Sequence, residues 1–328
     1  MLSPPADLDA SELVRALASW GLTAPRLDYL PVGFGSHHWR AKDGDGAVSF
    51  VTVDDLLATF RDADDADAAF SALERAYGAA AALRDEAGLE FVVAPTYNRD
   101  GGLMRRLGRR YSVSVAPFVE GAASAFGDYE TADERRAVAV LVGRLHAAGA
   151  QIGVAAGVDD VGIPSRAALS DALSALDRRW TTGPFAEPTR TLLAARAAEV
   201  ASRLREYDDL AATVRATSSS WVLTHGEPHR GNVIVDERGA RYLVDWDTTL
   251  VAPRERDLQL VLDDELTGWD EYRSVAGDGV LDARAIDLYR RRWTLADIAG
   301  FVALIRRPHD DDENTAATFT HLSGYLAR

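Results

Sequence analysis

Three oxygen-bearing side chains lie close together in one short stretch of the sequence. Glu227 is followed five positions later by Asn232, and Asp245 comes thirteen positions after that. Short apolar runs separate them, so these polar residues fall at strand ends and on the loop between strands. Phosphoryl transfer needs a group that orients or deprotonates the attacking hydroxyl, together with oxygen ligands for Mg²⁺. The pattern therefore indicates a phosphoryl transfer site, with Glu227 as the base and Asn232 and Asp245 as metal ligands.

Two histidines in the same stretch raise the alternative of a zinc site. His225 and His229 are four positions apart with a glutamate between them. Zinc sites of this kind lie on a helix, which Gly226 and Pro228 disfavour. The glutamate also stands at the wrong offset, and the chain has no cysteine to supply thiolate ligands. We therefore expect His229 to be a loop residue without a metal.

Three linked motifs follow one another in this part of the chain: HGEPHRGN at 225–232, LVDWD at 243–247 and LVAPRERDL at 250–258. Together they resemble the aminoglycoside phosphotransferase family, whose members are relatives of the protein kinases. The last motif is most similar to the spectinomycin phosphotransferase branch. The resemblance extends to a glycine-containing loop at 33–38, the pair at 145–146 and a late arginine-rich helix, so it spans most of the chain.

The resemblance implies an α+β, bilobal protein-kinase-like fold. Residues 1–118 would form a small β-rich nucleotide-binding lobe, and residues 119–328 a larger, mainly helical lobe for catalysis and substrate binding. ATP or GTP, with Mg²⁺, would lie in the cleft between them. The hinge at 117–121 would place the backbone of Phe118 and Val119 against the nucleotide base.

The resemblance also assigns the phosphate-binding elements. Gly33, Gly35 and Ser36 belong to the loop whose backbone amides would cradle the phosphates. Thr52 stands where the family has its phosphate-binding lysine, and the only lysine of the chain is Lys42, in a predicted hairpin turn. Either a neighbouring basic residue compensates, with His38 and Arg40 as the candidates, or nucleotide binding is weak, altered or absent.

Further roles follow from the same motifs. Glu227 takes the catalytic position, where the family usually has the shorter aspartate, so the loop must retreat to keep the carboxylate within hydrogen-bond reach. His225 and Asp257 match residues that brace the loop. Asp247 is a candidate second carboxylate or substrate contact. Acidic residues of the helical lobe often bind cationic antibiotics in this family, which adds the low-ranked substrate candidates Asp263, Asp264 and Glu265.

Hydrophobic periodicity and turn residues predict the elements that position these groups. We expect Asp9 or Ser11 to cap the first helix. The expected helices are residues 11–20, 64–85, 131–150, 166–180, 188–217, 281–305 and 316–327. The expected strands are 27–32, 37–41, 49–53, 91–93, 103–105, 111–116, 221–224, 233–236 and 242–245.

Charge and composition narrow the partners. The chain has 36 lysines and arginines against 51 aspartates and glutamates, a net charge of −15. This balance disfavours nucleic acid and suits a cationic, hydroxylated small molecule, although it also serves plain solubility. No apolar stretch is long enough to span a membrane and no signal peptide is visible, so we expect a cytoplasmic protein. Neither the acceptor nor the oligomeric state can be read from the sequence.

Two functions remain open at this point. The first is an ATP- or GTP-dependent O-phosphotransferase that acts on a hydroxyl of a small molecule, such as an aminoglycoside- or aminocyclitol-like antibiotic, in a resistance role. The second is a catalytically inactive protein of the same fold that binds a small molecule or nucleotide without phosphoryl transfer. Thr52 and Glu227 are the two departures that keep the second hypothesis in play.

Overall fold

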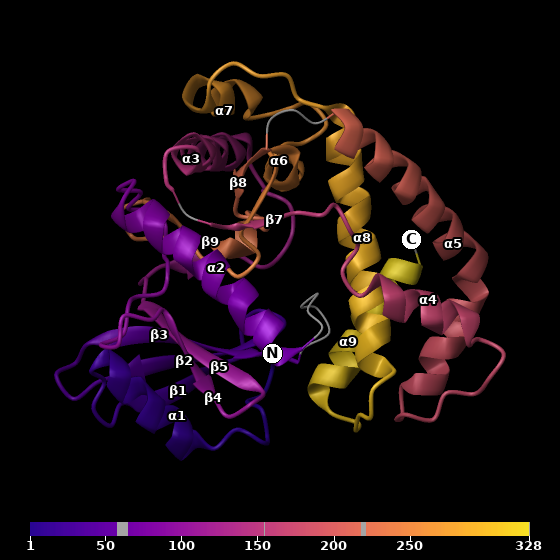
Figure 1. Ribbon diagram of the computed structural model, residues 1–328, viewed down its shortest axis with the longest axis horizontal. Helices are drawn as coiled ribbons and strands as arrows, with labels where there is room; N and C mark the ends of the chain where they lie inside the picture. Colours follow the sequence, from indigo (N-terminus) through magenta and orange to yellow (C-terminus); the bar gives the residue numbers. More distant parts are fainter. Residues whose placement is uncertain (58–64, 154, 218–220, 328) are drawn as a thin grey trace.

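The computed structural model describes residues 1–57, 65–153, 155–217 and 221–327. Its N-terminal part is built on a five-stranded antiparallel sheet with the strand order β1-β2-β3-β5-β4. The strands are β1 (Arg26–Leu30), β2 (Ser36–Lys42), β3 (Val48–Asp55), β4 (Met104–Leu107) and β5 (Tyr111–Pro117). The sheet lies at the lower left of Figure 1. The strands predicted at 27–32, 37–41, 49–53, 103–105 and 111–116 are therefore confirmed.

One face of this sheet packs against the first helix, α1 (Ala10–Leu17), which a 3₁₀ turn, η1 (Ala18–Trp20), continues. Asp9 caps α1 by accepting a hydrogen bond from the backbone N–H of Ser11 at 2.8 Å. Alternate residues of β3 and β5 are buried in this core, as period-two strands require. The apolar alternation visible in the sequence thus specifies which face of the sheet is covered.

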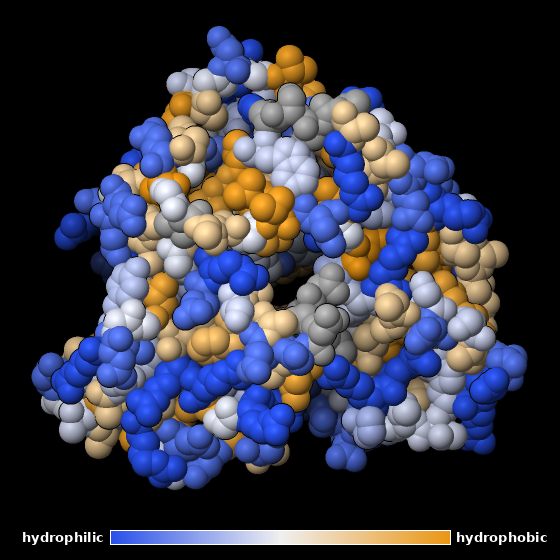
Figure 2. All heavy atoms as spheres, in the orientation of Figure 1, coloured by the Kyte–Doolittle hydropathy of each residue, from blue (hydrophilic) through white to orange (hydrophobic). Residues whose placement is uncertain are grey.

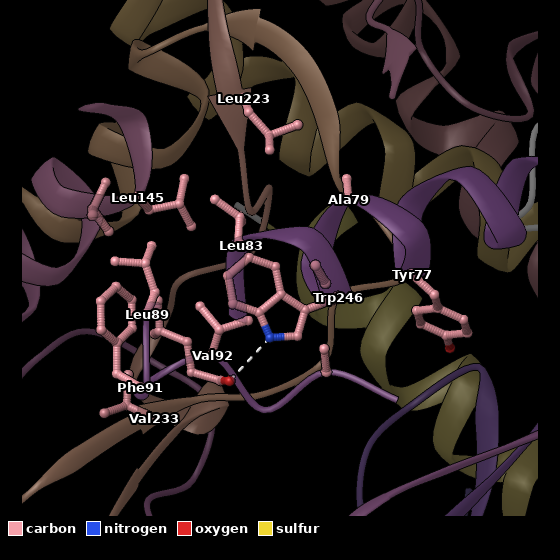
Figure 3. Packing of buried hydrophobic residues seen from close by; sticks show 14 of the residues in the cluster. Tyr77, Ala79, Leu83, Leu89, Phe91, Val92, Leu145, Leu223, Val233 and Trp246 are labelled. Carbon is pink, nitrogen blue, oxygen red and sulfur yellow. Dashed lines mark hydrogen bonds between the residues drawn. The ribbon is translucent and has the colours of Figure 1, made fainter. Parts of the chain in front are cut away.

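The second helix, α2 (Ala66–Asp85), packs in a different core from that of the sheet. Its buried side chains, among them Leu73 and Leu83, lie in one cluster with Leu145 of α3 and with Trp246. Figure 3 shows Leu83 beside the Trp246 indole, whose N–H donates to the Leu243 carbonyl at 3.0 Å. Helix α2 therefore joins the N-terminal part to the region that carries the candidate catalytic motifs.

The β-rich island among the helices is present as expected. It contains β8 (Trp221–Thr224), η2 (Arg230–Asn232), β9 (Val233–Val235), β10 (Arg241–Leu243) and β11 (Leu250–Pro253). Two small sheets result, β10-β9-β6 and β7-β11-β8, in which β6 (Ala122–Ala123) and β7 (Gly157–Val158) come from distant segments. Strand β11 was not expected. The predicted strand at 91–93 is wrong, because this segment makes only an isolated bridge between Val92 and Leu243.

The remainder of the chain is mainly helical. Its helices are α3 (Ala132–Gly149), α4 (Arg166–Ser174), α5 (Ala186–Thr217), α6 (Glu255–Val261), α7 (Trp269–Ala276), α8 (Ala283–Ile305) and α9 (Glu313–Leu326). Helix α4 ends six residues before the predicted 180, and the short helices α6 and α7 were not expected. In the described part of the chain, no helix is both long and apolar enough to cross a membrane.

Both parts of the molecule face a common hollow. In Figure 1 the sheet and α2 lie on one side and α8 and α9 on the other. Figure 2, in the same orientation, shows that the surface is hollowed between them. A β-sheet N-terminal part and a helical C-terminal part confirm the α+β prediction. The boundary between residues 1–118 and 119–328 stays a prediction, since α2 shares its core with the helical part.

Candidate active site

Asp257 holds the start of the candidate catalytic loop. Its carboxylate accepts hydrogen bonds from the backbone N–H of His225 at 2.8 Å and of Gly226 at 2.6 Å. His146 of α3 donates a third, from Nε2, at 3.0 Å. Burial opposes ionisation of this fully buried carboxyl, but its contacts with His146, His225 and Arg256 hold its pKa below the usual value. The buried charge therefore fixes the loop in one position.

His225 links the loop to the strand segment that follows it. Its Nε2 donates to the Val244 carbonyl at 2.9 Å, which leaves Nδ1 to accept the backbone N–H of Glu227 at 3.2 Å. Burial lowers the pKa of His225 to about 4, so the ring is neutral and can both donate and accept. Its ring also lies 4.4 Å from that of Trp246. These contacts are those of a positioning residue.

Gly226 is required by the backbone and by its surroundings. Its φ is +101°, a region that side-chain-bearing residues rarely adopt. A Cβ atom there would lie 2.5 Å from the guanidinium of Arg256 and from the hydroxyl of Thr248. Arg256 itself bonds Thr224 and the Thr248 carbonyl at 2.7 Å each. The glycine of the motif thus allows a buried arginine to pack directly beneath the loop.

The structure brings Glu227, Asn232 and Asp245 onto one connected piece of backbone. The amide Nδ2 of Asn232 donates to the Glu227 carbonyl oxygen at 3.0 Å, and the Asn232 carbonyl accepts from the backbone N–H of Val244 at 3.1 Å. Asp245 follows directly, with a φ of +68° and an exposed side chain. A left-handed conformation in a non-glycine residue is strained, and such strain is frequent at functional sites.

The donor set fits a divalent metal bound together with phosphates. Among the described residues, no group of three or more histidine, aspartate and glutamate side chains is placed to hold an ion without further ligands. Asn232 and Asp245 supply two hard oxygens, and Mg²⁺ usually takes only one or two protein oxygens beside phosphates and water. The two residues therefore match what a nucleotide-bound Mg²⁺ needs from the protein.

Glu227 lies in a strongly acidic environment. Burial raises its pKa to about 8, and the neighbouring carboxylates of Asp247 and Asp297 add to the shift, while Arg256 opposes it. Its side chain is 36% exposed and its Oε2 lies 3.9 Å from Nε2 of His229. A carboxyl with a pKa near neutrality is suited to accept a proton from an alcohol.

Asp297 was missed by the sequence analysis. It lies on α8, 70 positions after Glu227, in a segment without a recognisable motif. The only signal was its spacing with Trp293 and Phe301, four residues to either side, which share one face of a helix. Such spacing is normally a sign of core packing. Only the tertiary structure places Asp297 near Glu227.

The glycine-containing loop has the predicted position between β1 and β2. Gly33 and Gly35 have φ angles of +69° and +96°, and neither could be replaced without strain. The Ser36 hydroxyl does not point to a ligand but donates to Oδ1 of the buried Asp54 at 2.7 Å. Backbone amides, rather than the Ser36 side chain, are therefore what this loop offers to phosphates.

Thr52 faces His38 on the adjacent strand. Its hydroxyl lies 3.3 Å from Nδ1 of His38, in agreement with the β2–β3 register. Burial lowers the pKa of His38 to about 3, so this ring is uncharged near neutral pH. Arg40, the other candidate, lies over the Phe118 ring at 5.1 Å and 3.3 Å from Glu120. Of the two candidates, His38 lies beside Thr52, whereas Arg40 lies beside Phe118 at the hinge.

Helix α2 is tied to the sheet without the lysine–glutamate ion pair of kinases. Glu74 on this helix is exposed to solvent. Instead, the Tyr77 hydroxyl donates to Oδ2 of Asp54 at 3.3 Å, next to the Ser36 contact. A hydrogen bond from a neutral hydroxyl to a buried carboxyl group thus joins this part of the helix to the sheet.

The segment between the two parts is pinned to the catalytic region. Phe118 and Val119 are half-buried and follow the last residue of β5. Strand β6 then pairs with β9, and a Cβ atom on Gly121 would lie 2.6 Å from the Val235 carbonyl oxygen. The glycine lets the hinge pass directly over the strand that follows Asn232.

The three low-ranked acidic candidates have other contacts. Asp263 lies 3.4 Å from Arg135 and accepts the backbone N–H of Thr267 at 2.8 Å. Asp264 pairs with Arg290 at 3.0 Å on the surface, and Glu265 is exposed. No contact described for them reaches Glu227. The described structure thus gives Asp263 a turn-capping role, while Asp247 is the candidate that acts on Glu227.

Comparison with known proteins shows the family. A model of the APH phosphotransferase enzyme family matches residues 29–307, and the chain belongs to this family. Among characterised sequences, the chain is 28% identical to Protein StrN of Streptomyces griseus over 255 residues, which are 74% of this chain and 74% of StrN. The resemblance inferred from the three motifs is confirmed.

Solved structures of the same fold cover nearly the whole chain. Spectinomycin phosphotransferase in complex with ADP and spectinomycin superposes with a TM-score of 0.70 at 14% identity, covering 97% of this chain and 94% of that one. An amicoumacin kinase in complex with AMP-PNP, Ca²⁺ and its substrate gives a TM-score of 0.59 at 14% identity, covering 97% and 93%. These similarities confirm the kinase-like fold.

Proposed function

We propose that the protein transfers the γ-phosphoryl group of ATP or GTP to a hydroxyl of a small molecule. The observation that carries this proposal is the hydrogen-bonded loop that joins Glu227, Asn232 and the strand end before Asp245. A carboxylate and two hard oxygens on one rigid segment are the groups that phosphoryl transfer requires of a protein. Family membership supports the same reaction class.

The residues divide the work as follows. Asn232 and Asp245 would hold Mg²⁺, which supplies charge neutralisation to the phosphates when bound. Glu227 orients the acceptor hydroxyl and accepts its proton. The oxygen–phosphorus bond to the acceptor forms as the bond to the β-phosphate oxygen breaks, and the nucleoside diphosphate leaves with that electron pair. The backbone amides at Gly33 and Gly35 hold the phosphates, and the segment at Phe118 and Val119 holds the base.

The acceptor is proposed to be an aminoglycoside- or aminocyclitol-like molecule. The acidic groups around Glu227 favour a cationic ligand, and the chain carries a net charge of −15. Two proteins of this fold, a spectinomycin phosphotransferase and an amicoumacin kinase, support the same class of acceptor. A resistance role in the cytoplasm, without nucleic-acid partners, is part of this proposal.

One observation favours a second candidate, a protein of this fold that binds without turnover. The end of β3 near the glycine-containing loop has Thr52 beside an uncharged His38, and Arg40 on the same neighbouring strand lies at the hinge instead. A phosphate group there would be held by weaker contacts. Such a protein would bind a small molecule or nucleotide and release it unchanged.

The test is incubation with Mg-ATP or Mg-GTP and a panel of hydroxylated, amine-bearing antibiotics, followed by mass spectrometry. The proposal expects one acceptor to gain the mass of a single phosphoryl group. Ligand-dependent thermal stabilisation with no such product would favour the second candidate. The absence of both product and stabilisation across the panel would contradict the proposed acceptor class.

Glu227→Asp separates the two candidates further. If the loop has adapted to glutamate, shortening the side chain by one methylene should lower kcat about 10- to 100-fold, because the carboxylate no longer reaches the hydroxyl. A higher kcat in the variant would mean that glutamate at this position lowers the turnover that aspartate supports. The measurement is steady-state kinetics with the acceptor found above.

A further inference from the structure

One face of helix α8 carries an acid between aromatic residues and turns it toward the catalytic loop. Trp293, Asp297 and Phe301 follow one another at intervals of four residues. Asp297 is close enough to Glu227 for its charge to raise the pKa of that carboxyl. The edge-on contact between the rings of Trp293 and His229, with 6.1 Å between centroids, places the same face beside the catalytic loop.

Aromatic rings line this face on both sides of the acid. On the side of the catalytic loop, the Trp293 ring stacks on Phe126 with 5.7 Å between centroids, and His229 meets both rings edge-on. On the other side, Phe301 packs against Tyr325 of α9 at 6.2 Å. Aromatic rings therefore lie on both sides of Asp297, and the electron-rich faces of such rings attract cations.

The Asp297 carboxyl has neutral donors but no strong cation beside it. Burial raises its pKa to about 6, while donors on Tyr325 and Trp293 and the nearby His321 oppose the shift. In the described ranges, no arginine or lysine is among the groups that act on it. The other acid of α8 differs, since Asp287 pairs with Arg291 at 2.9 Å. A carboxylate kept from water without an arginine or lysine partner is stabilised when a ligand brings a permanent positive charge.

We propose that Asp297, bordered by Trp293 and Tyr325, binds an ammonium group of the acceptor and selects amine-bearing alcohols. This inference rests on the proposed function and names the residue that would recognise the amine. The acidic run 263–265 is not needed for it. An ammonium group at Asp297 leaves the rest of the acceptor over the Phe126–Trp293 stack, with a hydroxyl free to approach Glu227.

The first test needs no turnover. Tetramethylammonium is the minimal cationic probe and tert-butanol its neutral counterpart of similar shape. Binding is followed by NMR on the indole N–H signal of Trp293, which Trp293→Phe identifies by its loss. We expect a saturable shift with tetramethylammonium, none with tert-butanol, and at least tenfold weaker binding in Asp297→Asn. Asp287→Asn, on the exposed face of the same helix, should bind the probe as the parent protein does.

Three results would overturn the inference: no saturable shift with tetramethylammonium, an equal shift with tert-butanol, or unchanged binding in Asp297→Asn. A thermal melt of each variant excludes misfolding as the cause of weaker binding. Turnover distinguishes this inference from the proposed function. Cation binding without any phosphorylated acceptor would refute the enzyme but keep the subsite. Phosphorylation of an acceptor by a protein that does not bind tetramethylammonium would support the proposed function and refute the subsite at Asp297.

A second measurement applies to any amine-bearing acceptor that gains a phosphoryl group. Asp297→Asn should raise its KM at least tenfold and leave the KM for ATP unchanged, because the carboxylate contacts only the acceptor. The N-acetylated form of the same acceptor should show no such difference between parent and variant. Equal effects on the amine and its N-acetylated form would contradict recognition of the charge.

Discussion

The candidate catalytic loop at 225–232 and the end of the N-terminal sheet next to the glycine-containing loop are held in place by different kinds of contact. At the loop, charged and polar groups are buried and fully engaged, with Asp257 holding two backbone amides and a histidine. At the end of β3 near the glycine-containing loop, Thr52 meets an uncharged His38, and Glu74 of α2 is exposed to solvent. The loop is thus held by buried polar and charged groups, while the contact of Thr52 with His38 is between neutral groups.

This difference shows which parts of the fold depend on charge for their geometry. Helix α2 packs its apolar side with Trp246 and Leu145 in the core of the candidate catalytic region (Figure 3). Its links to the sheet include the Tyr77–Asp54 hydrogen bond and the ion pair between Asp67 and Arg106 of β4. The catalytic loop has no comparable apolar side, so its position depends on buried hydrogen bonds.

The largest expected effect is on the metal side of the loop. Asp245→Ala removes one of the two hard oxygens proposed to bind Mg²⁺, and it should abolish turnover, with a loss of at least about 1,000-fold in kcat/KM. The measurement is the phosphoryl mass gain at saturating Mg-ATP. Retained turnover would refute the metal assignment, and an unchanged melting temperature is the control for folding.

The second-largest expected effect concerns Asp257, whose carboxylate holds the start of the catalytic loop. Asp257→Asn replaces one acceptor oxygen by an N–H group that faces a backbone donor, so a buried hydrogen bond becomes a repulsive contact. We expect a loss of about 3 kcal/mol in the free energy of unfolding, measured by urea denaturation. Asp287→Asn, which breaks only an exposed ion pair, should cost less than about 0.5 kcal/mol. Equal losses would mean that the loop does not depend on the buried charge.

A smaller effect tests the sheet side of the comparison. Thr52→Lys places a compact positive charge where the family has one, and it should tighten Mg-ATP binding about tenfold. Thr52→Met, of similar length but neutral, should not tighten it. Isothermal titration calorimetry measures both. If the lysine gives no gain over methionine, the phosphates do not lie beside Thr52.

The smallest effect is the pH dependence that Glu227 contributes to stability. Its folded pKa of about 8 lies above the ordinary value of 4.5, so the folded protein binds more protons than the unfolded chain between these values. This contribution is therefore lost as pH rises from about 5 to 8. Glu227→Gln does not titrate, so its stability advantage over the parent should grow across that interval.

We expect this advantage to reach about 1 kcal/mol at pH 8.5. This is less than the free energy equivalent of the full pKa shift, because about a third of the Glu227 side chain is exposed to water, which screens its charge. Urea denaturation at pH 5.5 and pH 8.5 measures it. A constant difference between variant and parent would contradict the raised pKa of the base.

Local sequence patterns were enough to predict most of the strands and the grouping of the candidate site residues. Alternation of apolar residues predicted the strands of the N-terminal sheet, and the spacing of Glu227, Asn232 and Asp245 predicted that they group together, because a loop and the next strand end are neighbours in the chain. Short helices such as α6 and α7 escaped prediction, since one or two turns give too little periodicity.

Which residues from distant parts of the chain come together depends on how the whole chain packs. The sequence could not rank His38 against Arg40, because residues two positions apart in a strand lie on the same face of the sheet. Only the folded structure shows that His38 lies beside Thr52 and that Arg40 lies over the Phe118 ring at the hinge. It could not place Asp297 beside Glu227, because no local pattern encodes the packing of α8 against the catalytic loop. Burial then shifted the pKa values of these groups, and burial is a property of the folded chain as a whole.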